Sequence, residues 1–342
     1  MVFQVSILMP IRNEANHIQR SLEAVLRQDY PPECMEVLVA DGMSDDGTRE
    51  IISGYQQKYP HLKLIDNPRK IVPTGMNAAL KMARGEIIIR VDGHTLIAPD
   101  YVKQCVDALE RTHADNVGGR MNAIGQGAFG ETVALATSSP FGVGGARFHY
   151  SDQEEWVDTV YMGAWPSRVF QEIGFFDEEM VRNQDDELNY RLLGQGGKIL
   201  LSPQIKSVYT VRGSPKKLWK QYYQYGYWKV RVLQKHPRQM RLRQFVPPLF
   251  VASLVIALLL SVFTSFGRWI LAGIGGAYLV ANLAASIITS AKSGWKHLPL
   301  LPVVFAILHL SYGLGFLVGL VRFANRWNDK IGKVPRFETF HN

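Results

Sequence analysis

The sequence predicts an α/β fold, in which a parallel sheet is covered by helices, followed by a region of transmembrane helices. Three observations support this prediction. Short aliphatic runs alternate with helix-like segments up to residue 91, as in right-handed βαβ units. Two of these runs end in an acid, at the edge where a parallel sheet places its ligand-binding side chains. From residue 245 the chain is almost continuously apolar.

The N-terminal strands and helices follow from the spacing of apolar residues and from the turns between them. Runs rich in β-branched residues favour strands, and the turn Ser44-Asp45-Asp46-Gly47 is typical of a helix start. The expected strands are residues 4–9, 35–40, 62–65 and 86–91. The expected helices are residues 15–27, 48–58 and 74–83.

The pattern is less regular beyond residue 117. A glycine-rich loop is expected at 141–146, followed by a strand at 156–161 and a helix at 167–172. A second acidic cluster, NQDDELNYR (183–191), opens a further helix. The C-terminal part of the chain contains three apolar runs.

These runs, 245–266, 269–291 and 298–321, are each close to the length that spans a bilayer. Buried core helices are the alternative, but three such runs in succession are rare in soluble proteins. Basic residues flank both ends of the region, and both groups favour the cytoplasmic side, whereas three crossings would separate them. We therefore expect one re-entrant or interfacial segment, the third run (which begins LPLLP) being the candidate, or an exception to the charge rule.

The composition places the chain among folded proteins and excludes a disulfide-rich one. Of the 342 residues, 47% are hydrophobic and 20% charged, and the only cysteines are Cys34 and Cys105. The net charge of +8 favours contact with anionic phosphates or membrane lipids, and we expect no nucleic-acid partner. The N-terminus lacks the basic leader and cleavage site of a signal peptide, so we expect the N-terminal part to face the cytoplasm.

Six short motifs follow one another along the chain. They are PIRNE (10–14), Asp41 with SDDGT (44–48), GMN (75–77), ARGE (83–86), DGH (92–94) and QDDEL (184–188). In this order they resemble family 2 glycosyltransferases, over residues 3–235. The resemblance implies an inverting, nucleotide-sugar-dependent enzyme with a GT-A nucleotide-sugar-binding (Rossmann-like) domain. The apolar tail and the stretches GVGGARF and GAWP are most similar to the succinoglycan-type (ExoA-like) exopolysaccharide branch.

The donor nucleotide is expected at the ends of the first strands. A strand-end carboxylate can accept hydrogen bonds from a pyrimidine N–H or a ribose hydroxyl. The alternative for Asp41 is a turn-forming acid ahead of Gly42, and Asp45 and Asp46 are expected to be helix caps rather than donor contacts. The resemblance assigns contacts with the base to Pro10, Glu14 and Asp41, with Arg69 or Lys70 nearby.

The DGH motif stands where the family usually has Asp-x-Asp, which binds a divalent cation at the donor phosphates. By this resemblance Asp92 and His94 are candidate metal ligands. Imidazole is an acceptable ligand for Mn²⁺ but a poor one for Mg²⁺, so His94 favours Mn²⁺. The alternative is that His94 donates a hydrogen bond to phosphate while Asp92 alone holds the cation.

The second acidic cluster is expected to supply the catalytic base. Inversion by direct displacement requires a carboxylate that takes the proton of the acceptor hydroxyl. The family motif Glu-Asp-x-Asp maps onto Gln184–Glu187, which makes Asp185 the candidate and Asp186 the alternative. Acids at a helix N-terminus are also favoured by the helix dipole alone, although three in a row exceed what capping requires.

Two further features lie outside these motifs. Trp228 is a candidate aromatic platform for a sugar and Lys229 and Arg231 for a diphosphate, but an interfacial juxtamembrane helix would explain the same residues. The glycines of GQGAFG (125–130) spell a dinucleotide fingerprint, yet they follow a complete βαβ series rather than its first strand. An oxidoreductase is therefore not predicted.

The predicted organisation is a cytoplasmic catalytic domain over residues 1–240, a membrane region with two to three apolar helices over 241–326 and a short basic tail over 327–342. The resemblance implies transfer of a hexose from a UDP-sugar to a polyprenyl-diphosphate-linked saccharide, in exopolysaccharide or capsule biosynthesis at a bacterial-type inner membrane. A processive polysaccharide synthase and a catalytically silent, membrane-bound nucleotide or polysaccharide sensor are the alternatives.

Overall fold

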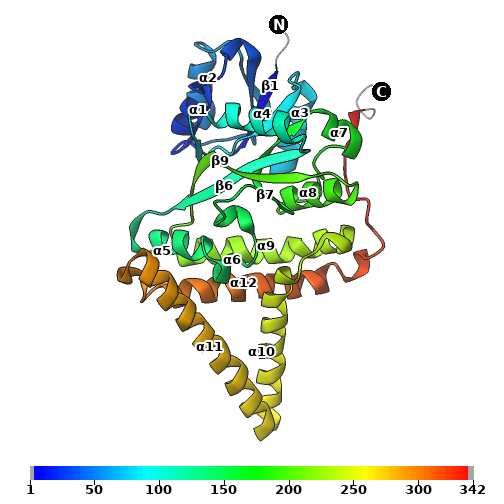
Figure 1. Ribbon diagram of the computed structural model, residues 1–342. Coiled ribbons are helices and arrows are strands. Elements are labelled where there is room, and N and C mark those ends of the chain that lie inside the picture. The colour runs from blue at the N-terminus through cyan, green and yellow to red at the C-terminus, as the bar shows by residue number, and fades with distance from the viewer. Residues whose placement is uncertain (1–3, 338–342) are drawn as a thin grey trace. The chain divides into compact units, whose positions relative to one another are not determined.

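The computed structural model describes residues 4–337, which form two compact units (Figure 1). The first unit comprises Met1–Asn122, Tyr150–Tyr209 and Ile331–Asn342, and the second comprises Ala123–His149 and Thr210–Lys330. The predicted catalytic region 1–240 therefore contributes to both units. The C-terminal segment belongs to the first unit, although the apolar helices of the second unit precede it.

The N-terminal half of the first unit follows the predicted βαβ pattern. Apolar runs form the strands because both faces of a parallel sheet are covered, and every residue of β1 and β2 is buried. The four parallel strands are β1 (Val5–Ile11), β2 (Met35–Asp41), β3 (Leu62–Asp66) and β4 (Ile87–Arg90). The helices between them are α1 (Ile18–Leu26), α2 (Thr48–Gln56) and α3 (Val72–Met82). These predictions are confirmed to within a few residues at each end.

The rest of the sheet is antiparallel, a pairing that the sequence pattern does not indicate. The strand order is β3-β2-β1-β4-β8-β6-β9-β5, with β7 paired to β9. The prediction of a strand at 156–161 is wrong, because only the two ends of this segment lie in strands. The added strands are β5 (Thr95–Ile97), β6 (Asn116–Ile124), β7 (Glu155–Trp156), β8 (Tyr161–Pro166) and β9 (Ile199–Thr210). The helices of this part are α4 (Tyr101–Thr112), which was not predicted, and α7 (Arg168–Ile173) and α8 (Gln184–Gly194), which confirm the helix expected at 167–172 and the one expected at the second acidic cluster.

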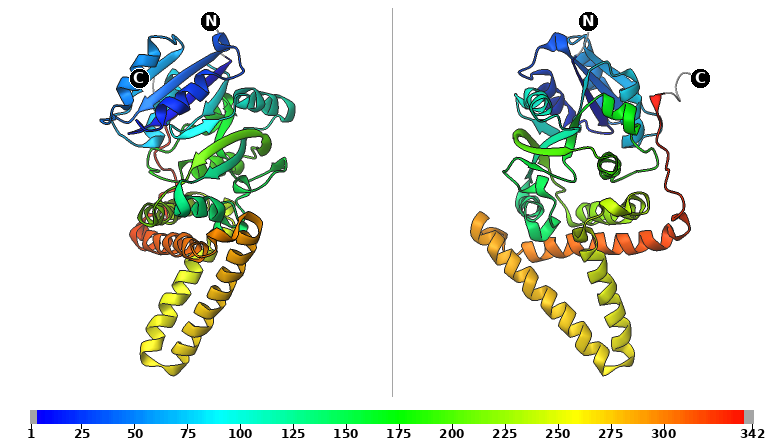
Figure 2. Two further views of the ribbon diagram at one scale, coloured as in Figure 1. Left: turned by 90° about the vertical axis from the view of Figure 1, so that its left-hand side faces the viewer. Right: turned by 45° about the vertical axis from the view of Figure 1, so that its right-hand side comes forward.

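The second unit is helical. Three of its helices are long and apolar enough to cross a membrane, as the hydropathy pattern predicts. Within this unit α10 and α11 form an antiparallel hairpin, whereas α12 runs along α9 (Figures 1 and 2). Its helices are α5 (Gly127–Thr137), α6 (Pro140–Val143), α9 (Pro215–Lys235), α10 (Val246–Phe263), α11 (Ser265–Ser293) and α12 (Leu301–Arg322).

The register of the parallel strands brings the predicted site residues to one edge of the sheet. Asp41 ends β2 opposite Ile11, the last residue of β1. Arg90 ends β4 opposite Leu8 of β1, so the chain from Val91 onward emerges at the same edge. Parallel strands align their carboxyl ends, and the loops that follow β1, β2 and β4 therefore meet.

Candidate active site

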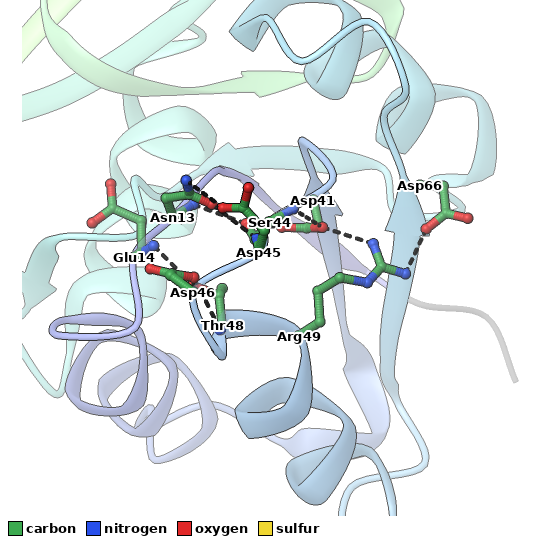
Figure 3. Close-up of polar contacts among 9 residues, drawn as sticks. All are labelled: Asn13, Glu14, Asp41, Ser44, Asp45, Asp46, Thr48, Arg49 and Asp66. Atoms are coloured by element: carbon green, nitrogen blue, oxygen red, sulfur yellow. Dashed lines mark hydrogen bonds and ion pairs between the residues drawn. The ribbon is translucent and has the colours of Figure 1, made fainter.

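Asp41 is fixed at the end of β2 by a network of hydrogen bonds (Figure 3). Its carboxylate is fully buried and accepts from the backbone N–H of Ser44 at 2.9 Å and from the Ser44 hydroxyl. The Arg49 guanidinium donates to Asp41 at 2.7 Å and, with its other nitrogen, to Asp66 at 2.7 Å. Arg49 thus links the ends of β2 and β3 and compensates the buried charge of Asp41.

The loops after β1 and β2 are bonded to each other at this edge (Figure 3). Asn13 donates its backbone N–H to the Ser44 hydroxyl at 2.8 Å and its side-chain amide to Asp45 at 3.0 Å. Asp46 accepts from the backbone N–H of Ala15 at 3.0 Å and of Thr48, the first residue of α2, at 3.1 Å. Asp46 therefore accepts from the first backbone N–H of α2, as expected of a helix cap, whereas Asp45, which was also expected to be a cap, accepts from the Asn13 side chain.

Glu14 and His94 meet although they are eighty positions apart in the chain. The Nδ1 atom of His94 lies 2.9 Å from Oε1 of Glu14, and the imidazole ring packs 5.6 Å from the ring of Tyr209. Gly93 permits this approach, because a Cβ there would lie 2.7 Å from a methyl carbon of Ile11. Glu14, a predicted contact of the nucleotide base, thus orients the imidazole of His94, a predicted metal ligand.

Arg90 connects the two acidic motifs. Its side chain is only 5% exposed, and its Nε donates to Asp92 at 2.8 Å while Nη1 pairs with Asp185 in the first turn of α8. The end of β4 and the start of α8 are thereby held together through one fixed cation. Arg90 was not predicted as a site residue; the available signal was a charged residue within the apolar run of β4.

Asp185 has the properties of a general base. Burial raises the pKa of its carboxyl to about 6, and this effect outweighs that of the nearby Arg90 guanidinium, which lowers the pKa. A carboxyl group that titrates near neutral pH can accept a proton in a transition state and release it afterwards. The neighbouring acid Glu187 is instead buried and paired with Arg191 at 2.7 Å, so it is structural. Asp186 is partly buried beside them.

We expect the maximal rate of sugar transfer to fall about tenfold for each pH unit below 6, because the protonated form of Asp185 cannot act as a base. With a carboxyl group of ordinary pKa near 4, the rate would not change down to about pH 5. The measurement is a pH–rate profile at saturating donor and acceptor, with nucleotide binding measured at each pH as the control. A flat profile between pH 7 and pH 5 would contradict the assignment.

The remaining predicted donor contacts lie near this edge of the first unit. Pro10 is in β1 opposite Ala40, one residue before the Ile11–Asp41 pair. Lys70 is exposed in the loop after β3 and has a left-handed backbone conformation, with φ of 61°. Arg69, the alternative to Lys70, is paired with Glu178.

The side chains at the DGH motif fit a divalent cation only in part. Within residues 4–337 no three His, Cys, Asp or Glu side chains converge to form a complete metal site. Asp92 and His94 supply two ligands at most, which suits a cation that takes its other ligands from donor phosphates and water. The bond from Nδ1 of His94 to Glu14 resembles the carboxylate support of metal-binding histidines, and Nε2 would be the coordinating atom.

The comparisons with known proteins agree with this geometry. Residues 6–172 match the family described as Glycosyl transferase family 2. Over 322 residues the chain is 30% identical to "Succinoglycan biosynthesis protein ExoA" of Rhizobium meliloti (strain 1021), which covers 94% of this chain and 96% of the relative. The protein belongs to glycosyltransferase family 2. The resemblance of its sequence motifs to this family is thereby confirmed.

Two further likenesses extend over most of this glycosyltransferase. A relative from Methanococcus voltae, named as a dolichyl N-acetyl-alpha-D-glucosaminyl phosphate 3-beta-D-2,3-diacetamido-2,3-dideoxy-beta-D-glucuronosyltransferase, is 28% identical over 93% of the chain and 97% of the relative. The structure of the mannosyltransferase PcManGT from Pyrobaculum calidifontis, in complex with GDP-Man and Mn²⁺, has a TM-score of 0.61 and 20% identity. It covers 92% of this chain and 87% of that one, which confirms the GT-A-like fold.

Helix α9 carries the predicted aromatic and basic residues of the glycosyltransferase. The ring of Trp228 packs against Tyr227 and Phe323 within the second unit, at 5.7 Å in each case. Arg231 is fully buried and donates to the backbone oxygens of Arg326 and Asp329. These contacts support the juxtamembrane interpretation of α9, and a role of Trp228 at the sugar stays a prediction.

Proposed function

We propose that this family 2 glycosyltransferase transfers a hexose from a UDP-sugar, with inversion, to a saccharide on a polyprenyl-diphosphate carrier in exopolysaccharide or capsule biosynthesis. The observation that carries the proposal is the Asp92–Arg90–Asp185 cluster, which places a carboxylate with a pKa near 6 at the sheet edge that also carries Asp41. The catalytic unit would face the cytoplasm of a bacterial-type inner membrane, where nucleotide-sugars are made.

The nucleotide would bind at the ends of β1 and β2. The Asp41 carboxylate can accept the N–H of a pyrimidine ring or a ribose hydroxyl, and the contacts with Ser44 and Arg49 hold it in one orientation. Pro10 would contact the base, and the exposed ammonium of Lys70 would meet the diphosphate.

The transfer step would be a direct displacement. The acceptor hydroxyl oxygen bonds to the anomeric carbon while the bond from that carbon to the diphosphate oxygen breaks, and UDP leaves with the bonding electrons. Asp185 would take the hydroxyl proton in the same step. Arg90 would act as a positioning residue, because it fixes the Asp185 carboxylate relative to Asp92.

A divalent cation at Asp92 and His94 would neutralise charge on the diphosphate as the glycosidic bond breaks. We expect EDTA to reduce transfer by more than about 100-fold and Mn²⁺ to restore it better than Mg²⁺, since imidazole is a poor ligand for Mg²⁺. His94→Asp, which recreates the usual Asp-x-Asp pattern, should then make Mg²⁺ as effective as Mn²⁺. Equal rates of sugar transfer with both cations in the wild type would exclude His94 as a metal ligand.

The lipid-linked acceptor is proposed from two observations. Three helices are long and apolar enough to cross a membrane, and a catalytic unit anchored in this way would have access to a lipid carrier. Two relatives that match nearly the whole chain are named for succinoglycan biosynthesis and for transfer to a dolichyl-linked sugar. Both names indicate assembly of glycans rather than modification of small soluble acceptors.

A donor and acceptor panel tests the proposal. Membranes that contain the protein are supplied with UDP-sugars, with GDP-mannose as the alternative donor class, and with a lipid extract that contains polyprenyl-linked saccharides. Metal-dependent transfer of one sugar from a UDP donor to the lipid fraction is the expected result. Addition of many sugars in succession would indicate a processive synthase. Tight UDP binding without any transfer would indicate a sensor.

A further inference from the structure

We infer that the chain crosses the bilayer twice, as the hairpin of α10 and α11, and that α12 lies with α9 on the lipid surface at the side of the catalytic unit. The partner of this surface is the membrane interface itself. The inference concerns topology, so it does not depend on the donor, the acceptor or the base proposed above.

The position of the C-terminal segment determines whether the number of membrane crossings is odd or even. The backbone N–H of Phe175 donates to the carbonyl of Pro335 at 2.9 Å, and that of Glu178 donates to Lys333 at 2.9 Å. The N–H of Lys333 in turn donates to the Asp177 carboxylate at 2.8 Å. These residues all belong to the first unit. One folded unit lies on one side of a membrane, so the apolar region between its two parts must cross an even number of times.

The exposure of side chains indicates which two helices cross. Apolar side chains of α10 and α11 point outward, including Leu249 at 68%, Val262 at 67% and Trp269 at 78% exposed. Without water in the bilayer core, such surfaces are stable only against lipid or other helices. At about 1.5 Å per residue, the 29 residues of α11 span about 44 Å, comparable to a whole bilayer with its headgroups.

Helix α12 differs because one face is closely packed against α9. A Cβ on Gly315 would lie 2.1 Å from the carbonyl oxygen of Tyr223, and one on Gly319 would lie 2.6 Å from that of Tyr227. The contacts advance along both helices in the same direction, and Gln234 near the end of α9 donates to the carbonyl of Phe323 at 2.8 Å. The two helices are therefore parallel and lie at the same depth along this contact.

The charges of α9 exclude a deep position for the pair. This 21-residue helix contains six basic residues, namely Lys216, Lys217, Lys220, Lys229, Arg231 and Lys235. Each lysine or arginine at the centre of a bilayer costs about 2.5–3.5 kcal/mol or more. If α12 crossed the hydrocarbon, the adjacent α9 would carry several of these charges with it. An interfacial position lets the exposed lysines of the first turns, Lys216, Lys217 and Lys220, reach headgroups.

An apolar stripe on the other face of α12 is the surface that would meet the lipid. Its members, Val303, Leu314, Val318 and Val321, recur at helical spacing and are 38–79% exposed. With two crossings the basic groups before and after the apolar region lie on one side, which removes the conflict with the charge rule that three crossings create.

Single-cysteine labelling tests this topology. In a Cys34→Ser background, where the remaining Cys105 is fully buried, four exposed positions are replaced one at a time: Ser53→Cys in the catalytic unit, Ser265→Cys at the hairpin turn, Ser293→Cys at the end of α11 and Ile331→Cys after α12. Each variant is treated with a membrane-impermeant maleimide, from the outside of spheroplasts and in inverted vesicles. A permeant maleimide and retained sugar transfer are the controls for reactivity and folding.

We expect labelling at positions 53, 293 and 331 from one side and at position 265 from the other. Labelling of position 331 from the side opposite to position 53 would establish an odd number of crossings and overturn the topology with two crossings. Labelling of position 265 from the same side as position 53 would overturn the crossing of the hairpin. Lys330→Cys repeats the decisive measurement one residue away, in case a cysteine at position 331 disturbs the C-terminal segment.

Discussion

Replacement of Asp185 by asparagine is expected to reduce sugar transfer by about 100-fold to 10,000-fold and to leave nucleotide binding unchanged. An amide cannot take the proton of the acceptor hydroxyl, but its oxygen can still accept a hydrogen bond from Arg90, so the local fold is retained. The measurement is transfer to lipid-linked saccharide by membranes that contain the variant, together with the affinity for UDP.

Asp186→Asn is the matched control, because it removes the same charge from the next residue of α8. We expect it to retain transfer to within about tenfold of the wild type. A larger loss in Asp186→Asn than in Asp185→Asn would move the role of base to Asp186, the alternative that the sequence leaves open. Equal activity of both variants and the wild type would exclude a catalytic base in this cluster.

The second large effect is expected at Arg90, where two changes are informative. Arg90→Met leaves two carboxylates without their shared cation, and breaking a buried ion pair in this way costs about 3 kcal/mol or more of stability. The guanidinium also lowers the pKa of Asp185, so its removal raises that pKa further and moves the half-maximal pH of transfer above about 6. Thermal inactivation in detergent and the pH–rate profile measure the two effects.

Arg90→Lys keeps the charge but cannot contact both carboxylates with a planar fork. It is expected to recover most of the stability and only part of the activity, which a purely structural role of Arg90 would not produce. Arg111→Met is the control, since it removes an exposed ion pair with Glu154 that contributes little. An unchanged pH profile in Arg90→Met would contradict the positioning role.

The elements up to β4 could be predicted because their signals are local. Aliphatic runs such as β1 and β2 can be buried on both faces only in a covered sheet, and the turns between them have characteristic residues. The antiparallel half of the sheet could not be predicted in this way. The pairing of β8 with β4 joins residues such as Trp165 and Ile88, far apart in sequence, and an irregular chain precedes β8.

The membrane region shows the same division. Its apolar composition predicts helices of the right length whatever their surroundings. Hydropathy does not report what covers a helix, and α12 is as apolar as a spanning helix. Its different role follows only from the glycine contacts with α9 and from the return of the chain to the first unit.

The sequence by itself determined the family and the N-terminal βαβ order, and it made Asp41, Asp92 and Asp185 candidate site residues, because motifs and strand-end positions are properties of neighbouring residues. Only the tertiary structure decided which charges compensate those acids. Arg49 reaches Asp41 across eight positions and Arg90 joins Asp92, two positions away, to Asp185, 95 positions away, so their roles depend on distance and burial rather than on spacing. A buried carboxylate is stable when a cation or donor lies within hydrogen-bonding distance, and that distance is set by the packed fold.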